Sequence, residues 1–78
     1  MQLHYDPQAD AIYVRFAEPE TSVRTERLDR RRLIDYDEQN EPVGVEFLSV
    51  SEGIEFAGIP RANEIREALH SLSSLAPA

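Results

Sequence analysis

The stretch Ala11-Ile12-Tyr13-Val14-Arg15-Phe16 predicts a β-strand more clearly than any other part of the chain. Successive side chains of a strand point to opposite faces, so Ile12, Val14 and Phe16 share one face. The opposite face is more polar, because it holds a tyrosine and an arginine. This alternation predicts a half-buried strand, and its period of two is the pattern to look for in the flanking segments.

Four further strands are predicted, at residues 2–5, 22–28, 33–36 and 43–48. The first is joined to 11–16 by Asp6-Pro7-Gln8-Ala9-Asp10, where proline fixes φ and the aspartates bond nearby backbone N–H groups. Asn40 lies in the loop before the last strand and is the residue there best able to take a positive φ. Connections this short exclude parallel crossovers, so we expect an antiparallel meander.

After Gly58 the apolar period changes from two to three and four. The stripe of an amphipathic helix runs through Ile59, Ala62, Ile65, Leu69, Leu72 and Leu75 or Ala76. Pro60 suits a first turn, so the helix is predicted at about 60–75 and the sheet at about 2–56. The predicted fold is α+β, an antiparallel β-meander of about five short strands with one C-terminal amphipathic helix, and residues 1–78 form a single small domain.

Length and composition predict self-association. A chain of 78 residues buries only about 60% of the surface that its unfolded form exposes, and small domains commonly need a disulfide, a metal or a partner chain. The sequence has no cysteine, and its two histidines, His4 and His70, lie at opposite ends. Apolar residues are expected on both sheet faces, with Leu33, Leu48 and Val50 opposing Ile34 and Phe47. One helix covers one face, so we expect a homodimer.

The net charge of −7, from 15 acids and 8 bases, disfavours a nucleic-acid coat and a binder of anionic membranes. The longest wholly apolar run is 11–14, far below the roughly 20 residues of a membrane span. The first residues lack the basic and apolar regions of a signal peptide. Together with the missing cysteines, these features predict a cytoplasmic protein that makes no membrane contact.

Four aspartates flank two of the predicted turns: Asp6, Asp10, Asp35 and Asp37. If both turns met at one end of the sheet, the carboxylates would suit Mg²⁺ or Ca²⁺. The preference of aspartate for turns explains the same residues without a metal. The segment from Asp35 also lacks the glycine and the distal glutamate of a calcium loop. We expect no metal site, and a metal- or small-ligand-binding domain stays an alternative.

Three tyrosines, Tyr5, Tyr13 and Tyr36, lie beside these acids, an arrangement that a general acid would use. Tyrosines more often fill a sheet face with their rings and leave the hydroxyl at the edge. The sequence has no nucleophile–base pair, no glycine-rich phosphate loop and no Ser/His/Asp grouping. We therefore expect neither an enzyme nor a cofactor.

Five of the eight arginines gather between residues 24 and 32: Arg24, Arg27, Arg30, Arg31 and Arg32. With two acids the segment has a charge of +3, while three arginines and thirteen acids give the remainder −10. A cationic turn suits phosphate, nucleic acid or an acidic protein, and it also protects a strand edge. About three to five phosphate contacts would fade at physiological salt. We predict contact with an acidic partner protein or a second copy, and nucleic acid is disfavoured.

Two stretches together resemble a known bacterial family. Residues 5–16 resemble Y-D-x-x-A-D-A-x-Y-[IV]-x-[FL], and Asp35-Tyr36-Asp37 with Val43-Gly44-Val45-Glu46-Phe47-Leu48 resembles D-Y-D-…-V-G-[IV]-E-[IF]-L. Both motifs occur in this order in the domain-of-unknown-function family numbered 2283. The resemblance covers about residues 2–56 and leaves the helical tail outside. One departure is Asn40, which stands where the family commonly has glycine.

The resemblance implies a sheet-rich fold and no established activity, so it supplies no catalytic residue. Some members are encoded beside small ribonuclease-like toxins, which implies a binding role. The predicted function is a small oligomeric protein-interaction module, such as the binding half of a two-protein system. The alternatives are a metal- or small-ligand-binding domain and a weak nucleic-acid binder that uses the arginine-rich turn.

Overall fold

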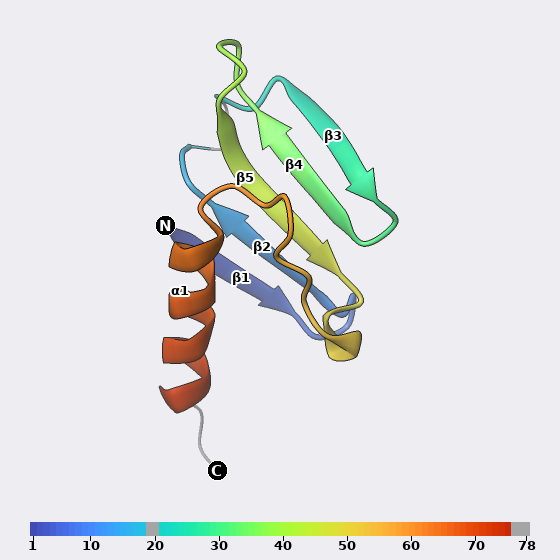
Figure 1. Cartoon of the computed structure of the whole chain (residues 1–78), viewed down its shortest axis with the longest axis vertical. Coiled ribbons are helices and arrows are strands. Elements are labelled where there is room, and N and C mark those ends of the chain that lie inside the picture. Colours follow the sequence, from blue (N-terminus) through green and yellow to red (C-terminus); the bar gives the residue numbers. More distant parts are fainter. Residues whose placement is uncertain (19–20, 76–78) are drawn as a thin grey trace.

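The computed structural model describes residues 1–18 and 21–75, which form a sheet of antiparallel strands, a 3₁₀ helix and an α-helix (Figure 1). The elements are β1 (Gln2–Asp6), β2 (Ala11–Arg15), β3 (Arg24–Asp29), β4 (Arg32–Tyr36), β5 (Pro42–Leu48), η2 (Val50–Glu52) and α1 (Ala62–Leu75). All neighbouring strands pair antiparallel in one open sheet. The predicted α+β fold, with one antiparallel sheet and a C-terminal helix, is confirmed.

The strand order across the sheet is β1-β2-β5-β4-β3, so the predicted meander is wrong at one connection. β2 pairs with β5 instead of β3, and Val14 lies opposite Val45. A plain meander would put β3 in the middle of the sheet, although all six of its residues are exposed. β5 is the better central strand because four of its seven residues are buried. The most apolar strands take the centre, and the charged strand is left at an edge.

One face of the sheet carries the core, and α1 and the segment before it lie over that face (Figure 1). Six buried apolar residues form the core cluster: Val14, Ile34, Val45, Phe47, Ile59 and Ile65. Ile65 of α1 is fully buried, and Leu69 packs partly buried against the cluster. The ring of Phe56 meets that of Phe47 edge-on, with centroids 6.0 Å apart. The segment before the helix therefore belongs to the layer that covers the sheet.

The segment between the sheet and the helix is a loop. β5 ends at Leu48, where the predicted last strand also ends, so residues 49–56, which the sequence assigned to the sheet region, lie outside the sheet. α1 begins at Ala62, against a predicted start near 60. Asp10 holds the start of the loop, because its carboxylate accepts hydrogen bonds from the backbone N of Ser51 (3.0 Å) and its hydroxyl (2.7 Å). The helix begins after Arg61, whose φ is 55° and whose carbonyl accepts the first helical bond, from Ile65. Within the described residues, no helix has the length and apolarity to cross a bilayer.

Candidate functional site

The sheet face opposite α1 is not covered by another described element, and we call it the open face. Its side chains come from the central strands and β3 and include Tyr13, Arg15, Thr25, Arg27, Leu33, Asp35, Glu46 and Leu48. Their neighbours on β2, β4 and β5 point into the core, and the β3 residues share this face because Thr25 pairs with Asp35 and Arg27 with Leu33. Leu33 and Leu48 do lie on this face, partly buried, but Val50 packs against the core on the other side. The open face is therefore more polar than the sequence predicted.

A hydrogen-bonded network joins three strands in the middle of the open face. The hydroxyl of Tyr13 on β2 donates to Oδ2 of Asp35 on β4, at 2.6 Å. The hydroxyl of Thr25 on β3 donates to Oδ1 of the same carboxylate, at 2.5 Å. Hydrogen bonds to a charged acceptor are shorter and stronger than neutral ones. Because each partner is on a different strand, the network links β2, β3 and β4 and constrains the side chains of Tyr13, Thr25 and Asp35.

The network depends on Gly44 of β5, because β5 lies between β2, which carries Tyr13, and β4, which carries Asp35. Gly44 is opposite Arg15 on one side and Asp35 on the other, so the side chain of Tyr13 reaches across it. A Cβ at residue 44 would lie 2.2 Å from the Tyr13 hydroxyl and 2.8 Å from Cζ. The glycine is thus required by the close approach of a side chain. Sequence reasoning missed this site, because Tyr13, Asp35 and Gly44 come together only through the strand order.

The surroundings of Tyr13 hold its phenol in the neutral form. Partial burial, followed by the hydrogen bond to Asp35, raises the pKa of Tyr13 to about 12. The Arg15 guanidinium, 5.9 Å from the centre of the ring, opposes the shift, but its effect is smaller. A phenol with this pKa transfers protons poorly near neutral pH. Tyr13 is therefore suited to donate a fixed hydrogen bond.

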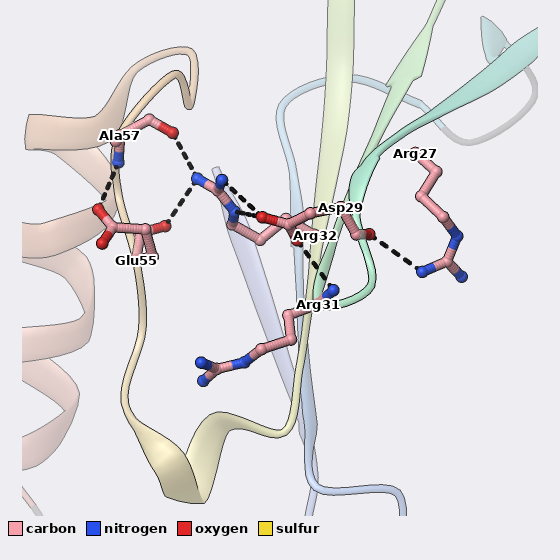
Figure 2. Close-up of polar contacts among 6 residues, drawn as sticks. All are labelled: Arg27, Asp29, Arg31, Arg32, Glu55 and Ala57. Atoms are coloured by element: carbon pink, nitrogen blue, oxygen red, sulfur yellow. Dashed lines mark hydrogen bonds and ion pairs between the residues drawn. The ribbon is translucent and has the colours of Figure 1, made fainter.

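Two of the five clustered arginines attach the loop after β5 to the sheet, and we call Arg31 and Arg32 the arginine clasp (Figure 2). Arg32 donates from Nε (3.0 Å) and Nη2 (2.8 Å) to Oδ2 of Asp29. Its Nη1 donates to the carbonyls of Glu55 (3.3 Å) and Ala57. Arg32 lowers the pKa of the Asp29 carboxyl, with a smaller effect from the Arg31 backbone N–H. The planar guanidinium suits such a set of acceptors.

Arg31 holds the first part of the same loop. Its Nη2 donates to the carbonyls of Ser49 (3.1 Å) and Gly53 (2.5 Å). The backbone N of Arg31 donates to Oδ1 of Asp29 at 2.9 Å, which closes the turn between β3 and β4. The clasp residues were predicted to contact a partner, but their donors are directed into the chain itself. Replacing Arg30, Arg31 and Arg32 together would therefore remove hydrogen bonds within the chain as well as surface charge.

The other three arginines of the cluster are exposed. Arg24 lies over the ring of Tyr36, 4.2 Å from its centroid, and donates to Oδ1 of Asn40 from Nε (3.2 Å) and Nη2 (2.8 Å). Arg27 donates to the backbone carbonyl of Asp29 at 3.0 Å (Figure 2). Arg30 is at the tip of the β3–β4 turn and has no hydrogen bond or ion pair with the described residues. Within the cluster, Arg27 and Arg30 are therefore the exposed arginines whose side chains are not paired with another described side chain.

The four turn aspartates do not converge, because their turns lie at opposite ends of the sheet (Figure 1). Asp6 accepts from the backbone of Gln8 and Ala9, and Asp37 accepts from Gln39 and Glu41. Asp10 holds η2, and Asp35 belongs to the Tyr13 network. The idea of one carboxylate site is therefore wrong. Among residues 1–18 and 21–75, no three acids, histidines or cysteines are placed to hold a metal ion.

The remaining candidates for chemistry lie apart from one another. Tyr5 is 60% exposed, and His4 and His70 are exposed on β1 and α1. A hollow of about 200 Å³ lies between the clasp and β5 and is lined by Asp29, Arg31, Arg32, Phe47, Leu48, Gly53, Ile54 and Glu55. Pockets for drug-sized ligands are about 300–1,000 Å³. The hollow is smaller than these, and the Arg31 and Arg32 donors that border it already bind loop carbonyls.

The fold and the site define a small α+β protein with one covered and one polar sheet face. A family model described as a protein of unknown function (DUF2283) matches residues 2–51, which include all five strands. The chain belongs to this family. The sequence-based resemblance is therefore confirmed, and α1 lies outside the matched region. No curated protein and no solved structure matches the chain.

Proposed function

We propose that the chain is a protein-interaction module whose open face binds a partner protein. The observation that supports this is the network of Tyr13, Asp35 and Thr25, which fixes polar side chains on an uncovered sheet face. Many antiparallel sheets leave one face in water, so an exposed face does not by itself indicate a binding site. A surface whose rotamers are already fixed loses less conformational entropy on binding, and this favours recognition.

The chemistry of the partner follows from the charges beside the network. Arg27 shares the open face with Thr25, and Arg30 follows at the adjoining turn. Guanidinium groups bind carboxylates through paired hydrogen bonds, and charge complementarity mainly sets orientation and specificity. The partner surface is therefore expected to carry carboxylates opposite Arg27 and Arg30. The −7 charge of the whole chain favours a protein partner over nucleic acid.

Binding, rather than catalysis, accounts best for the polar groups at the site. Both oxygens of Asp35 accept hydroxyl hydrogen bonds, and the pKa of Tyr13 is raised to about 12. A phenol with this pKa is poorly suited to proton transfer near neutral pH. We place this binding role in the cytoplasm, in keeping with a small domain that uses no cysteine.

The test is capture of the partner from the cells that make this protein, with arginine variants of matched charge. The chain with Arg27→Gln and Arg30→Gln is compared with the chain with Arg61→Gln and Arg66→Gln. The second pair removes the same charge from the α1 side, where Arg61 lies over Phe16 and Arg66 over Phe56. A specific partner should lose at least tenfold in capture with the first pair and keep its capture with the second. Circular dichroism checks that both variants fold.

Equal loss with both pairs would contradict the proposal, because it would indicate a general charge effect. Submicromolar binding of random DNA or RNA at about 0.15 M salt, lost with Arg27→Gln and Arg30→Gln, would instead favour the nucleic-acid alternative.

A further inference from the structure

The sheet has two edges, β1 and β3, and no described strand lies beyond either of them. An edge strand exposes unpaired N–H and C=O groups, and proteins protect such edges with charges and bulges. β3 has both devices, since four of its six residues are charged and its register with β4 shifts between Arg27 and Asp29. β1 has neither, because Asp6 at its end is its one charged residue and its five pairs with β2 are continuous.

Exposed apolar side chains lie at both edges of the sheet, but at β3 they stand among charged residues and at β1 they do not. Tyr5 is 60% exposed and Met1 is 45% exposed. Tyr5 and Leu3 lie on the α1 side of the sheet, because they pair with Ile12 and Val14, which pack there. The later turns of α1 extend past the outer edge of β1 (Figure 1). A strand added to β1 would therefore lie beneath this part of the helix and be covered on that face.

We infer that the strand added here is β1 of a second copy, antiparallel, so that two sheets join into one. Two chains that each carry −7 repel one another, and their contact is least unfavourable where charge is sparse. Addition of a strand to an exposed sheet edge supplies affinity through main-chain hydrogen bonds. This inference goes beyond the proposed function, which concerns the open face and the arginines at its β3 edge.

The register follows from using the whole of β1. Pairing centred on His4 matches all five residues of one β1 with those of the other. It brings Leu3 opposite Tyr5 of the second copy, twice by symmetry, and such aliphatic–aromatic pairs stabilise sheets. Asp6 then faces Gln2 of the second copy, so no like charges are opposed. His4 is the one residue that faces its own symmetry mate.

Light scattering with size-exclusion chromatography tests the interface. The wild-type chain should elute as a dimer with twice its 8.9 kDa mass at micromolar concentration. Tyr5→Lys places a charge on the β1 edge and should weaken the dimer at least tenfold. Val23→Lys is the matched control, because Val23 is similarly exposed (54%) but lies beside β3, and it should leave the dimer intact. A wild-type monomer, or a dimer that only Val23→Lys weakens, overturns the inference.

Cysteine variants test the register, since the chain has no cysteine of its own. His4→Cys should form a disulfide-linked dimer on mild oxidation, because directly opposed strand residues lie within disulfide range. Gln2→Cys alone should not, because it faces Asp6 of the second copy. Absence of the His4→Cys link, or a faster link from Thr25→Cys on β3, contradicts the pairing. Either failure leaves the proposed function standing, since that is tested by Arg27 and Arg30.

Discussion

Gly44→Ala is the substitution that tests the organisation of the open face most directly. The new methyl group would lie 2.2 Å from the Tyr13 hydroxyl and 3.2 Å from the Val14 carbonyl. The ring of Tyr13 has to move away, and this breaks its 2.6 Å hydrogen bond to Asp35. Hydrogen bonds to charged groups contribute about 1.5–3 kcal/mol, and overpacking costs about 1–3 kcal/mol. Because the ring is able to swing outward, we expect a total loss of about 2–3 kcal/mol.

Urea unfolding followed by circular dichroism measures this loss, with every variant at one protein concentration because association would shift the midpoint. The decisive comparison is a double-mutant cycle with Tyr13→Ala. When the tyrosine is absent, Gly44→Ala should cost less than about 1 kcal/mol, since the clash with the ring is gone. Equal costs in both backgrounds would refute the reasoning, because they would assign the effect to the backbone at Val14.

Three further predictions concern single side chains. Phenolate absorbance should show one of the three tyrosines ionising near pH 12, and Asp35→Asn should lower that pKa. Because the pKa of Tyr13 is raised in the folded state, its contribution to stability is complete below about pH 10 and is lost as pH rises through about 12. Arg32→Ala should lower the free energy of unfolding by about 2 kcal/mol, because the loop carbonyls lose their donor, and Arg32→Lys should not restore it. Arg30→Ala is the control and should change stability by no more than about 0.5 kcal/mol. An equally small cost for Arg32→Ala would contradict the role of the clasp. Asn40→Ala and Asn40→Gly both remove the acceptor of the Arg24 hydrogen bonds, but glycine is free to adopt φ 64°. The glycine variant should therefore be about 1 kcal/mol more stable than the alanine variant in the same unfolding measurement.

Local patterns in the sequence were sufficient for the elements. Alternation at 11–16 and 43–48 located β2 and β5 to within a residue, because the period of two is a property of the strand itself. Asn40 was predicted to take positive φ, and it does, with φ 64°. The same reasoning did not find positive φ at Ser49 or Arg61, since these residue types give no such signal. The predicted sheet region, to about 56, and the predicted helix, from about 60, therefore both extended into the loop from 49 to 61.

Contacts between distant segments could not be read in this way. The five arginines appear equivalent in sequence, yet Arg31 and Arg32 bind the loop carbonyls of Ser49 and Ala57, while Arg30 stays exposed. Nothing in the pattern of residues 24–32 distinguishes them, because their acceptors are backbone atoms some twenty residues away. Backbone carbonyls occur at every position and leave no mark in a sequence.

The sequence by itself determined the α+β class, the strand and helix types and the family motifs, because hydrophobic period and turn chemistry are local properties. The tertiary structure decided that β5 lies between β2 and β4. That order brings Tyr13, Gly44 and Asp35 together on the open face, and the alternating direction of the strands puts the turns at 6–10 and 37–41 at opposite ends of the sheet. Strand order is set by which strands need a neighbouring strand along both edges, and this is a property of the whole sheet rather than of any segment.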